Sequence, residues 1–357
     1  MKFGLFFVMQ RPDHLSERYI YETELAQMVA ADELGYDSVW IAEHHFSSFG
    51  VCSAPQVLAA AVAGQTKRLR VGMGITLLPL HDPVQIAEEL AVLDVLSGGR
   101  LDVGIGRAST GIEYAGYNIA HEESRARVDE GLEMLRGLWT QETFSYAGSF
   151  RRVRDVRLIP KPLQKPHPPV FLACNSAETV PIAARHGLPM MSAFIVLDEA
   201  LAERRDLYRR VSAEHGHAPA EVEARLAQTW NIRFVYVAED ERAALADPRE
   251  HLLGYLGAAT VRPRAATSRP RVHADWTYEE HLRAGTAFYG TPDQVVDKIG
   301  RFHEATRIDN LLCFMSVRAI NPGKVLRSME LFAAKVMPHF SEVRTPRSNV
   351  EIRAPTS

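Results

Sequence analysis

The stretch Asp37-Ser-Val-Trp-Ile-Ala-Glu-His-His-Phe46 places three ionisable side chains directly after an apolar segment. The apolar half is typical of a parallel strand that is buried on both faces. Glu43, His44 and His45 follow it, and burying such groups is costly unless they gain partners or serve a reaction. In α/β enzymes, chemistry is usually carried out just past the carboxyl ends of the strands. Two structural, hydrogen-bonded histidines also explain the pair when it is taken alone.

Two later segments end with residues that suit a phosphate. Gly104-Ile-Gly106-Arg107 combines glycines, which let an anion approach the backbone, with a guanidinium that can fork onto phosphate oxygens. Asn175-Ser-Ala-Glu-Thr179 opens a predicted helix, so its free N–H groups and hydroxyls also suit an anion. An ordinary surface ion pair for Arg107 and an ordinary N-cap for Ser176 are the structural alternatives.

Several other kinds of site are not indicated. Gly104-x-Gly106 lacks the third glycine of a dinucleotide fingerprint, and no Gly-Lys-Ser/Thr of a P-loop follows it. Adjacent residues of a strand point to opposite sides, so His44 and His45 do not converge on one ion, and no carboxylate-rich triad accompanies them. We therefore expect no metal. The three cysteines are irregularly spaced and odd in number, which favours neither a disulfide framework nor a zinc site.

Composition narrows the class of protein. The 357 residues are 46% hydrophobic, enough for a substantial core, and the net charge of −3 gives no reason to expect nucleic-acid or membrane-surface binding. The apolar run at residues 1–8 is too short for a signal core or a membrane span and has no small-residue cleavage site. We interpret it as the first strand of a cytoplasmic enzyme.

Strand-like and helix-like patterns alternate along the chain and must position these residues. Strands are expected at 2–9, around 39–41, and at 69–78, 101–105, 170–173, 189–196, 230–237 and 310–315. Helices are expected at 21–34, 54–66, 84–96, 122–139, 177–186, 198–215, up to about 259, and at 292–305 and 322–338. Eight βα units close most simply into a (β/α)8 TIM barrel with its site at the carboxyl ends of the strands.

Three segments depart from this rhythm. Residues 144–169 are expected to form a small excursion from the barrel, which includes a hairpin. Residues 260–290 are long and rich in proline and arginine, which favours a lid-like insertion. Residues 341–357 are polar and are expected to form a flexible tail. The rest of 1–340 is predicted to be one domain.

A set of motifs resembles one known family. In chain order they include Gly35-Tyr-Asp-Ser-Val-Trp, Glu43-His-His-Phe-x-x-Phe-Gly50, Asp94-x-x-Ser-x-Gly-Arg100, Ser124-Arg-Ala126 and Ala183-Ala-x-x-Gly-Leu-Pro-Met190. The family is that of the bacterial luciferase-like, flavin-dependent monooxygenases, and the likeness is greatest to its catalytic α-type subunits. It extends from residue 1 to about 340 and is weakest at 240–290.

The resemblance implies a (β/α)8 barrel that binds reduced FMN and activates O2 as a flavin C4a-(hydro)peroxide. It implies that His44 is the catalytic histidine and that Glu43 and His45 support it. It places a non-prolyl cis peptide at Gly74-Ile75, beside the flavin ring. The residues matched to the cofactor are Gly74, Ile75, Gly106, Arg107, Arg125, Asn175, Ser176 and Thr179. Gly106 replaces a reactive cysteine of the luciferases, and Asn175 replaces a glutamate.

The expected function is that of a two-component monooxygenase. A separate reductase would supply FMNH2, since no nicotinamide fingerprint appears, and a small, largely apolar aldehyde, ketone or aromatic compound would be oxygenated. An F420-dependent oxidoreductase of the same superfamily and a non-catalytic flavin-binding subunit are the alternatives. A homodimer is expected, with the apolar 54–66 and 84–96 segments as its interface. The sequence names neither the organic substrate nor the reductase, and does not tell whether light is emitted.

Overall fold

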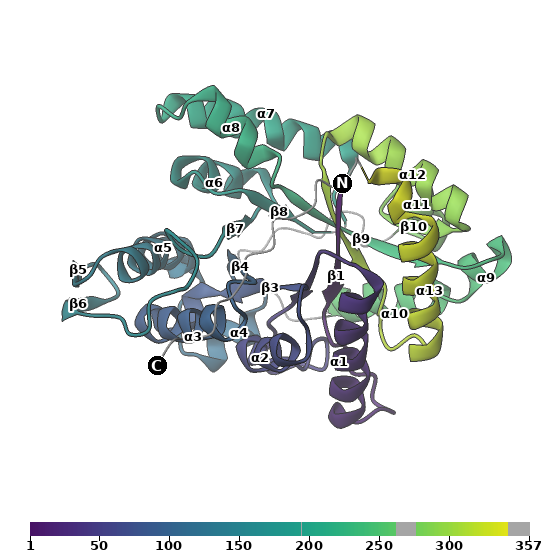
Figure 1. The fold of residues 1–357 in the computed structure, drawn as a ribbon, viewed down its shortest axis with the longest axis horizontal. Coiled ribbons are helices and arrows are strands. Elements are labelled where there is room, and N and C mark those ends of the chain that lie inside the picture. The colour runs from purple at the N-terminus through teal and green to yellow at the C-terminus, as the bar shows by residue number, and fades with distance from the viewer. Residues whose placement is uncertain (194, 262–275, 342–357) are drawn as a thin grey trace, which may run out of the picture.

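Eight parallel strands form the centre of the protein in the computed structural model, which describes residues 1–193, 195–261 and 276–341 (Figure 1). Their order around the ring is β1-β2-β3-β4-β7-β8-β9-β11, and pairing of β11 with β1 closes it. The strands are β1 (Lys2–Phe7), β2 (Ser38–Ile41), β3 (Arg70–Leu77), β4 (Leu101–Gly106), β7 (Val170–Ala173), β8 (Met190–Ser192), β9 (Trp230–Val237) and β11 (Asn310–Phe314).

Helices surround this barrel on its outer side (Figure 1). They are α1 (Glu17–Leu34), α2 (Pro55–Gln65), α3 (Pro83–Leu96), α4 (Gly111–Gly116), α5 (Ser124–Thr140), α6 (Val180–His186), α7 (Asp198–Glu214), α8 (Pro219–Leu226), α9 (Glu241–Ala246), α10 (Arg249–Val261), α11 (Tyr278–Arg283), α12 (Pro292–Thr306) and α13 (Pro322–Lys335). Short 3-10 turns are η1 (Leu78–Leu80), η2 (His121–Glu123), η3 (Ala177–Thr179) and η4 (Met337–Phe340). None of the described helices is both long and apolar enough to span a bilayer.

The predicted (β/α)8 barrel is confirmed, and its eight strands are the eight expected segments. The predicted strand at 189–196 is shorter, because β8 ends at Ser192. The described elements that were not predicted include the helices α4, α8 and α11. They also include β10 (Ala287–Gly290), a ninth parallel strand that pairs with the second half of β9. The predicted insertion near 260–290 is described only at its ends, in α10, α11 and β10. The predicted tail lies outside the described residues, except for its first residue.

The apolar strand before Glu43 is explained by the barrel interior. Trp40 is fully buried there, edge-on to Phe171 and tilted against Trp230. A Cβ atom at Gly72, on the neighbouring strand β3, would collide with the Trp40 indole. The large ring and the facing glycine are therefore matched, and this packing fixes β2 in register with β3.

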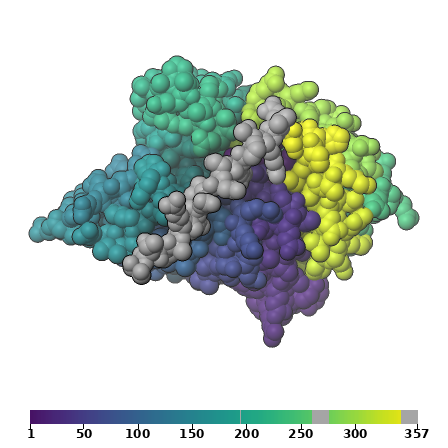
Figure 2. Space-filling model, viewed as in Figure 1, coloured from purple at the N-terminus to yellow at the C-terminus, as the bar shows by residue number. Residues whose placement is uncertain are grey.

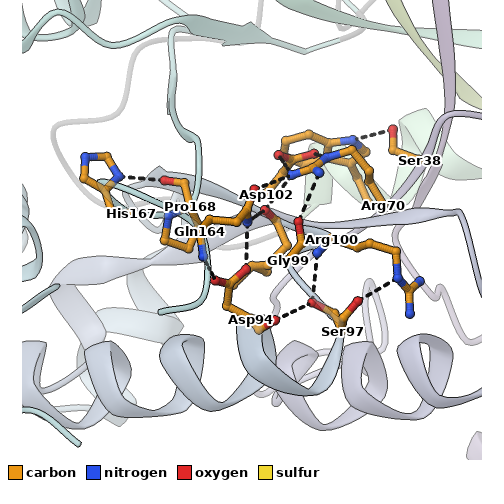
Figure 3. A network of polar contacts seen from close by, with 12 residues as sticks. Ser38, Arg70, Asp94, Ser97, Gly99, Arg100, Asp102, Gln164, His167 and Pro168 are labelled. Carbon is orange, nitrogen blue, oxygen red and sulfur yellow. Dashed lines mark hydrogen bonds and ion pairs between the residues drawn. The ribbon is translucent and has the colours of Figure 1, made fainter. Parts of the chain in front are cut away.

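The Asp94-x-x-Ser-x-Gly-Arg100 motif belongs to a network of polar contacts (Figure 3) that includes Arg70 and Asp102, at the amino ends of β3 and β4. Arg100 donates hydrogen bonds to the carbonyls of residues 63, 66, 69 and 97 and to one threonine hydroxyl, which ties α2, β3 and α3 together. Arg70 forms a bidentate ion pair with Asp102, and Gln164 bonds both Asp94 and the Leu101 carbonyl. This motif is therefore structural.

The excursion contains an antiparallel hairpin of β5 (Phe144–Ala147) and β6 (Arg152–Val156), at the left edge of Figure 1. Its turn is held by Glu130 of α5, whose carboxylate accepts from the backbone N–H groups of residues 149–151. Figure 2 shows the yellow C-terminal helix against the purple N-terminal segment. The Met1 amino group there donates to the Phe340 carbonyl at 2.8 Å.

Candidate active site

A cavity of about 290 Å³ opens at the carboxyl ends of the barrel strands. Among the predicted site residues, His44, Gly74, Ile75, Arg107 and Asn175 line it. Most of its remaining wall is apolar and comes from many elements: Phe6, Val8, Phe49, Leu77, Met191, Ile195, Ile232, Tyr255 and Ala259. Five predicted residues from strands β2, β3, β4 and β7 are thus brought to one hollow.

His44 is held on several sides. Its Nδ1 lies 3.3 Å from Oε1 of Glu113, and Phe49 meets the imidazole edge-on with the ring centres 5.2 Å apart. A Cβ atom at Gly50 would lie 2.5 Å from His44 Cδ2 and 2.8 Å from the Val8 carbonyl, so only glycine lets the ring rest there. Phe49 and Gly50, the last two residues of the motif that begins at Glu43, therefore help to position the His44 imidazole.

Glu43 makes direct hydrogen bonds to His45 and to His81, while its supporting role toward His44 stays a prediction. Its Oε1 lies 2.8 Å from Nε2 of both His45 and His81, and its Oε2 accepts from the Leu77 N–H at 3.1 Å. The Tyr117 hydroxyl lies 3.1 Å from His45 Nδ1, and His45 is almost wholly buried. As expected for adjacent residues, His44 faces the cavity and His45 points into the packed interior.

Charge is balanced within this buried network. Burial alone would raise the pKa of the Glu43 carboxyl, but hydrogen bonds from His45 and His81 and the charge of His81 hold it below its ordinary value. Burial would lower the pKa of His81, but its hydrogen bond and attraction to Glu43 raise it. Both shifts favour an ionised carboxylate paired with a protonated imidazole, and this pair joins the ends of β2 and β3.

The predicted phosphate ligands lie around one polar end of the site. Arg107 is partly buried and donates to the Ser124 hydroxyl at 3.0 Å. Burial, and then the nearby charge of Arg125, lower the pKa of the Arg107 guanidinium, so its cationic form would gain from an anion. Arg125 forms an ion pair with Glu178 at 2.8 Å. Two arginines from β4 and α5 therefore face one region, and a carboxylate already shares it.

Residues 175–179 contribute backbone and hydroxyl groups at the same end. The Asn175 side-chain oxygen accepts from the Ala193 N–H at 2.8 Å, which joins the ends of β7 and β8. Ser176 precedes the turn η3 without a side-chain cap, and the Thr179 hydroxyl donates back to the Ser176 carbonyl at 2.8 Å. Ser176, Thr179 and Arg125 do not line the 290 Å³ cavity.

The Gly74–Ile75 peptide is cis, as the resemblance implies, and both residues line the cavity. Gly106 does not line it, because the Ile75 side chain lies against it. A Cβ atom at Gly106 would collide with Ile75 and come within 3.0 Å of Ala173. Glycine at this position therefore makes room for Ile75, which takes up the space beside β4.

Glu113 is the main site residue that sequence reasoning missed. It lies on α4, is 1% exposed, and receives a 2.6 Å hydrogen bond from the Thr110 hydroxyl at its Oε2. Thr110-x-x-Glu113 has the spacing of a capping box, which could have drawn attention to it. Here the two side chains bond each other, so the carboxylate is directed toward His44. Tyr255 of α10 also lines the cavity, and no motif in the sequence around it indicates this.

A larger hollow of about 1030 Å³ lies at the amino ends of the strands, among Asp37, Arg70, Asp102, Trp230 and Asp309. Its charged groups include the Arg70–Asp102 and His303–Asp309 pairs, and no predicted site residue lines it. Active sites of (β/α)8 enzymes lie at the carboxyl ends of the strands. We therefore assign the chemistry to the smaller, mostly apolar cavity.

The fold and the cavity together define a (β/α)8 barrel enzyme whose site presents a histidine–carboxylate pair and a partly buried arginine. Comparison with known proteins gives the family. The sequence profile of the luciferase-like monooxygenases matches residues 1–307, and the chain belongs to that family, as its motifs predicted.

Relatives span nearly its whole length. The alkanal monooxygenase alpha chain of Photorhabdus luminescens is 26% identical over 96% of this chain and 98% of its own. The oxygenase component of the flavin-dependent trigonelline monooxygenase of Acinetobacter baylyi is 26% identical, over 99% of both chains. The crystal structure of monooxygenase RslO1 from Streptomyces bottropensis superposes with a TM-score of 0.84 at 31% identity, over 96% of this chain and 100% of that one.

Proposed function

We propose that this enzyme is the oxygenase component of a two-component system. It would use FMNH2 from a separate reductase, together with O2, to oxygenate a small, largely uncharged organic molecule. The observation that carries the proposal is the shared cavity of His44, Gly74, Ile75 and Arg107 at the carboxyl ends of the strands. The A. baylyi relative, named both as flavin-dependent and as an oxygenase component, supports the cofactor and the division of labour.

The residues present fit FMN. Arg107 and Arg125 offer two guanidinium groups to its phosphate, and Ser176 and Thr179 add hydroxyls. Burial and the nearby Arg125 disfavour the positive charge of Arg107. Among the described residues, its one hydrogen-bond partner is the uncharged Ser124 hydroxyl. That arrangement suits an anionic ligand. Glu178 would have to release Arg125 when the phosphate binds.

Bound FMNH2 would supply the electrons that activate dioxygen. The chain would exclude water with its apolar wall, including Phe49, Ile195 and Tyr255, since reactive oxygen chemistry needs a dry site. The same wall favours an uncharged substrate, because a charged substrate would lose its hydration against mostly apolar side chains. His44 would accept or donate one proton at the reacting group.

The alternatives differ in what they require. A non-catalytic flavin-binding subunit has no need for a histidine–carboxylate pair in the cavity, so this pair favours an enzyme. An F420-dependent oxidoreductase would use the same fold, and cofactor binding separates it. The names of the relatives refer to alkanals and to trigonelline, so membership of the family does not fix the substrate.

Anaerobic titration tests the cofactor. We expect FMNH2 to bind more tightly than FMN, and Arg107→Ala to weaken FMNH2 about 10- to 100-fold, the scale of a lost charge-assisted hydrogen bond of ~1.5–3 kcal/mol. Arg152→Ala, an exposed arginine on β6, is the matched control and should bind as wild type does. Tight binding of F420, FAD or NADH in place of FMNH2 would contradict the proposal.

Turnover tests the reaction. Candidate ketones, aldehydes and aromatic compounds are incubated with the enzyme, FMN, NADH and a general flavin reductase, and products are analysed by mass spectrometry. The expected product carries one oxygen atom from O2, as shown with labelled dioxygen. A product with altered hydrogen content but no added oxygen would indicate the oxidoreductase alternative.

We also propose a homodimer that uses α2 and α3. Val57 on α2 is 72% exposed and Leu96 on α3 is 64% exposed, and Val92 and Val95 are exposed as well. Helices α2 and α3 pack against each other, so these side chains belong to adjoining elements. Exposed apolar residues grouped in this way favour an interface between subunits.

A further inference from the structure

We propose that Glu113 is a positioning residue that keeps the proton of neutral His44 on Nδ1, so that His44 exchanges protons with the bound ligand through Nε2. The inference rests on the proposed function for the identity of the ligand only. Its structural basis is the contact between a buried carboxylate and one ring nitrogen of a histidine that lines the cavity.

Glu113 is placed by groups that donate hydrogen bonds to it. The Thr110 hydroxyl binds Oε2 at 2.6 Å, and the His45 backbone N–H approaches Oε1 at 3.5 Å. Because Oε1 also lies 3.3 Å from His44 Nδ1, the carboxylate is an acceptor toward every one of these groups. An ionised carboxylate can only accept, so its contact with His44 is a hydrogen bond only if Nδ1 carries the hydrogen, and this selects one tautomer.

The ring of His44 cannot easily turn to present its other nitrogen to Glu113. Phe49 stands edge-on to it, and the ring lies so close to residue 50 that a Cβ atom there would come within 2.5 Å of Cδ2. The His44 backbone N–H is fixed as well, because it donates to the Cys52 carbonyl at 3.0 Å. Side-chain and backbone contacts therefore define both the position of the imidazole and the nitrogen that Glu113 engages.

The chemical consequence is a proton relay with a defined direction. When a ligand group releases a proton to Nε2, the imidazole becomes an imidazolium, and the adjacent carboxylate stabilises the new positive charge. Return of that proton to the ligand or a product restores the neutral ring. Glu113 does not receive the proton. Besides His44 and Glu113, the ionisable side chains among the described residues that line the cavity are Arg107 and Tyr255.

Nitrogen-15 NMR of the cofactor-free protein tests the inference directly. With labelled histidine, the His44 resonances are assigned by their loss in His44→Ala. We expect the neutral ring of wild type to be protonated at Nδ1. In Glu113→Gln, we expect the pH midpoint of the His44 titration to fall by about 1–3 pH units, because an opposite charge within hydrogen-bonding distance shifts a titration by that amount.

Kinetics gives a second measurement. The limb of the pH–rate profile that reports the histidine should move to lower pH in Glu113→Gln. Glu130→Gln is the matched control: Glu130 is a similarly buried glutamate, but it caps the β5–β6 hairpin outside the cavity. That variant should lose stability without moving the His44 titration. If Glu113→Gln does not fold, Thr110→Val, which removes the 2.6 Å donor, replaces it and should raise the proportion of the other tautomer.

The inference is overturned if folded Glu113→Gln keeps the wild-type His44 titration, or if wild-type His44 is protonated at Nε2. These outcomes do not depend on flavin. A shifted titration in a protein that neither binds FMNH2 nor oxygenates a substrate would leave Glu113 as the positioning residue and refute the proposed function. Normal FMNH2-dependent turnover of the wild type, together with an unchanged His44 titration in Glu113→Gln, would support the proposed function and refute the role of Glu113.

Discussion

Replacing Glu43 with glutamine should destabilise the fold strongly, although glutamine differs from glutamate by one atom type. The carboxylate accepts from three groups: His45 Nε2, His81 Nε2 and the Leu77 N–H. Because the ionised Glu43 carboxylate can only accept, His45 Nε2 carries the hydrogen toward it. A glutamine keeps one acceptor oxygen and turns an NH2 group toward at least one of these donors.

The magnitude follows from this count. One charge-assisted hydrogen bond of ~1.5–3 kcal/mol is lost, and a buried donor left unsatisfied costs ~1–3 kcal/mol. The free energy of unfolding should therefore fall by about 2.5–6 kcal/mol, comparable with breaking a buried ion pair by removing one partner. Urea denaturation followed by circular dichroism measures the change. Glu88→Gln, an exposed glutamate on α3, should lie within ~0.5 kcal/mol of wild type.

The effect should also depend on pH with a definite sign. Because folding lowers the pKa of Glu43, its ionisation contributes to the free energy of unfolding at pH values above the ordinary pKa of 4.5. This contribution is lost as the pH falls through the pKa of Glu43 in the folded protein. Because the His81 pKa is raised, its contribution is complete below 6.5 and is lost as the pH rises through the folded value. The difference between wild type and Glu43→Gln should be largest between pH 4.5 and 6.5. A difference below ~0.5 kcal/mol in that window would refute the reasoning.

Three further predictions concern catalysis, soluble yield and assembly. His44→Ala should bind FMNH2 as wild type does, because the proposed phosphate-binding residues come from other elements. It should lower product formation by about 10²–10⁴-fold in stopped-flow or steady-state assays. Normal turnover of this variant would remove His44 from the mechanism. His45→Ala should instead lower soluble yield, because it removes a partner of the buried Glu43. Leu96→Asp together with Val57→Asp should convert a dimer to a monomer in light scattering, and a wild-type mass near that of the 39.9 kDa chain would already reject the dimer.

The barrel could be predicted because its strands are marked by local patterns. Buried runs such as 230–237 and turns such as the one at Gly35 carry their signal within a few residues. Strand β10 has only four residues and follows a proline- and arginine-rich stretch, so its apolar run did not stand out. Its identity as a strand depends on pairing with β9, about 50 residues earlier in the chain, and no local pattern contains that information.

The site could be predicted only as far as the strand ends reveal it. The position of His44 after β2 indicated a cavity residue, and the structure places it there. Glu43 was expected only to support His44, and the carboxylate that lies beside the His44 imidazole, Glu113, comes from another βα unit. Likewise, His81 balances Glu43 across 38 positions. Such pairings are decided when separate units fold together, and a single sequence does not display them.

The pairing of β1 with β11 has a consequence for synthesis of the chain on the ribosome. The first strand leaves the ribosome with one edge that is satisfied only by residues 310–314. At about 5–20 residues per second, those residues follow roughly 15–60 seconds later. During that interval the nascent barrel is an open sheet with an exposed, apolar edge of the kind that promotes aggregation. Expression yield should therefore depend on chaperones that shield nascent chains, and slower translation before residue 310 should lower it.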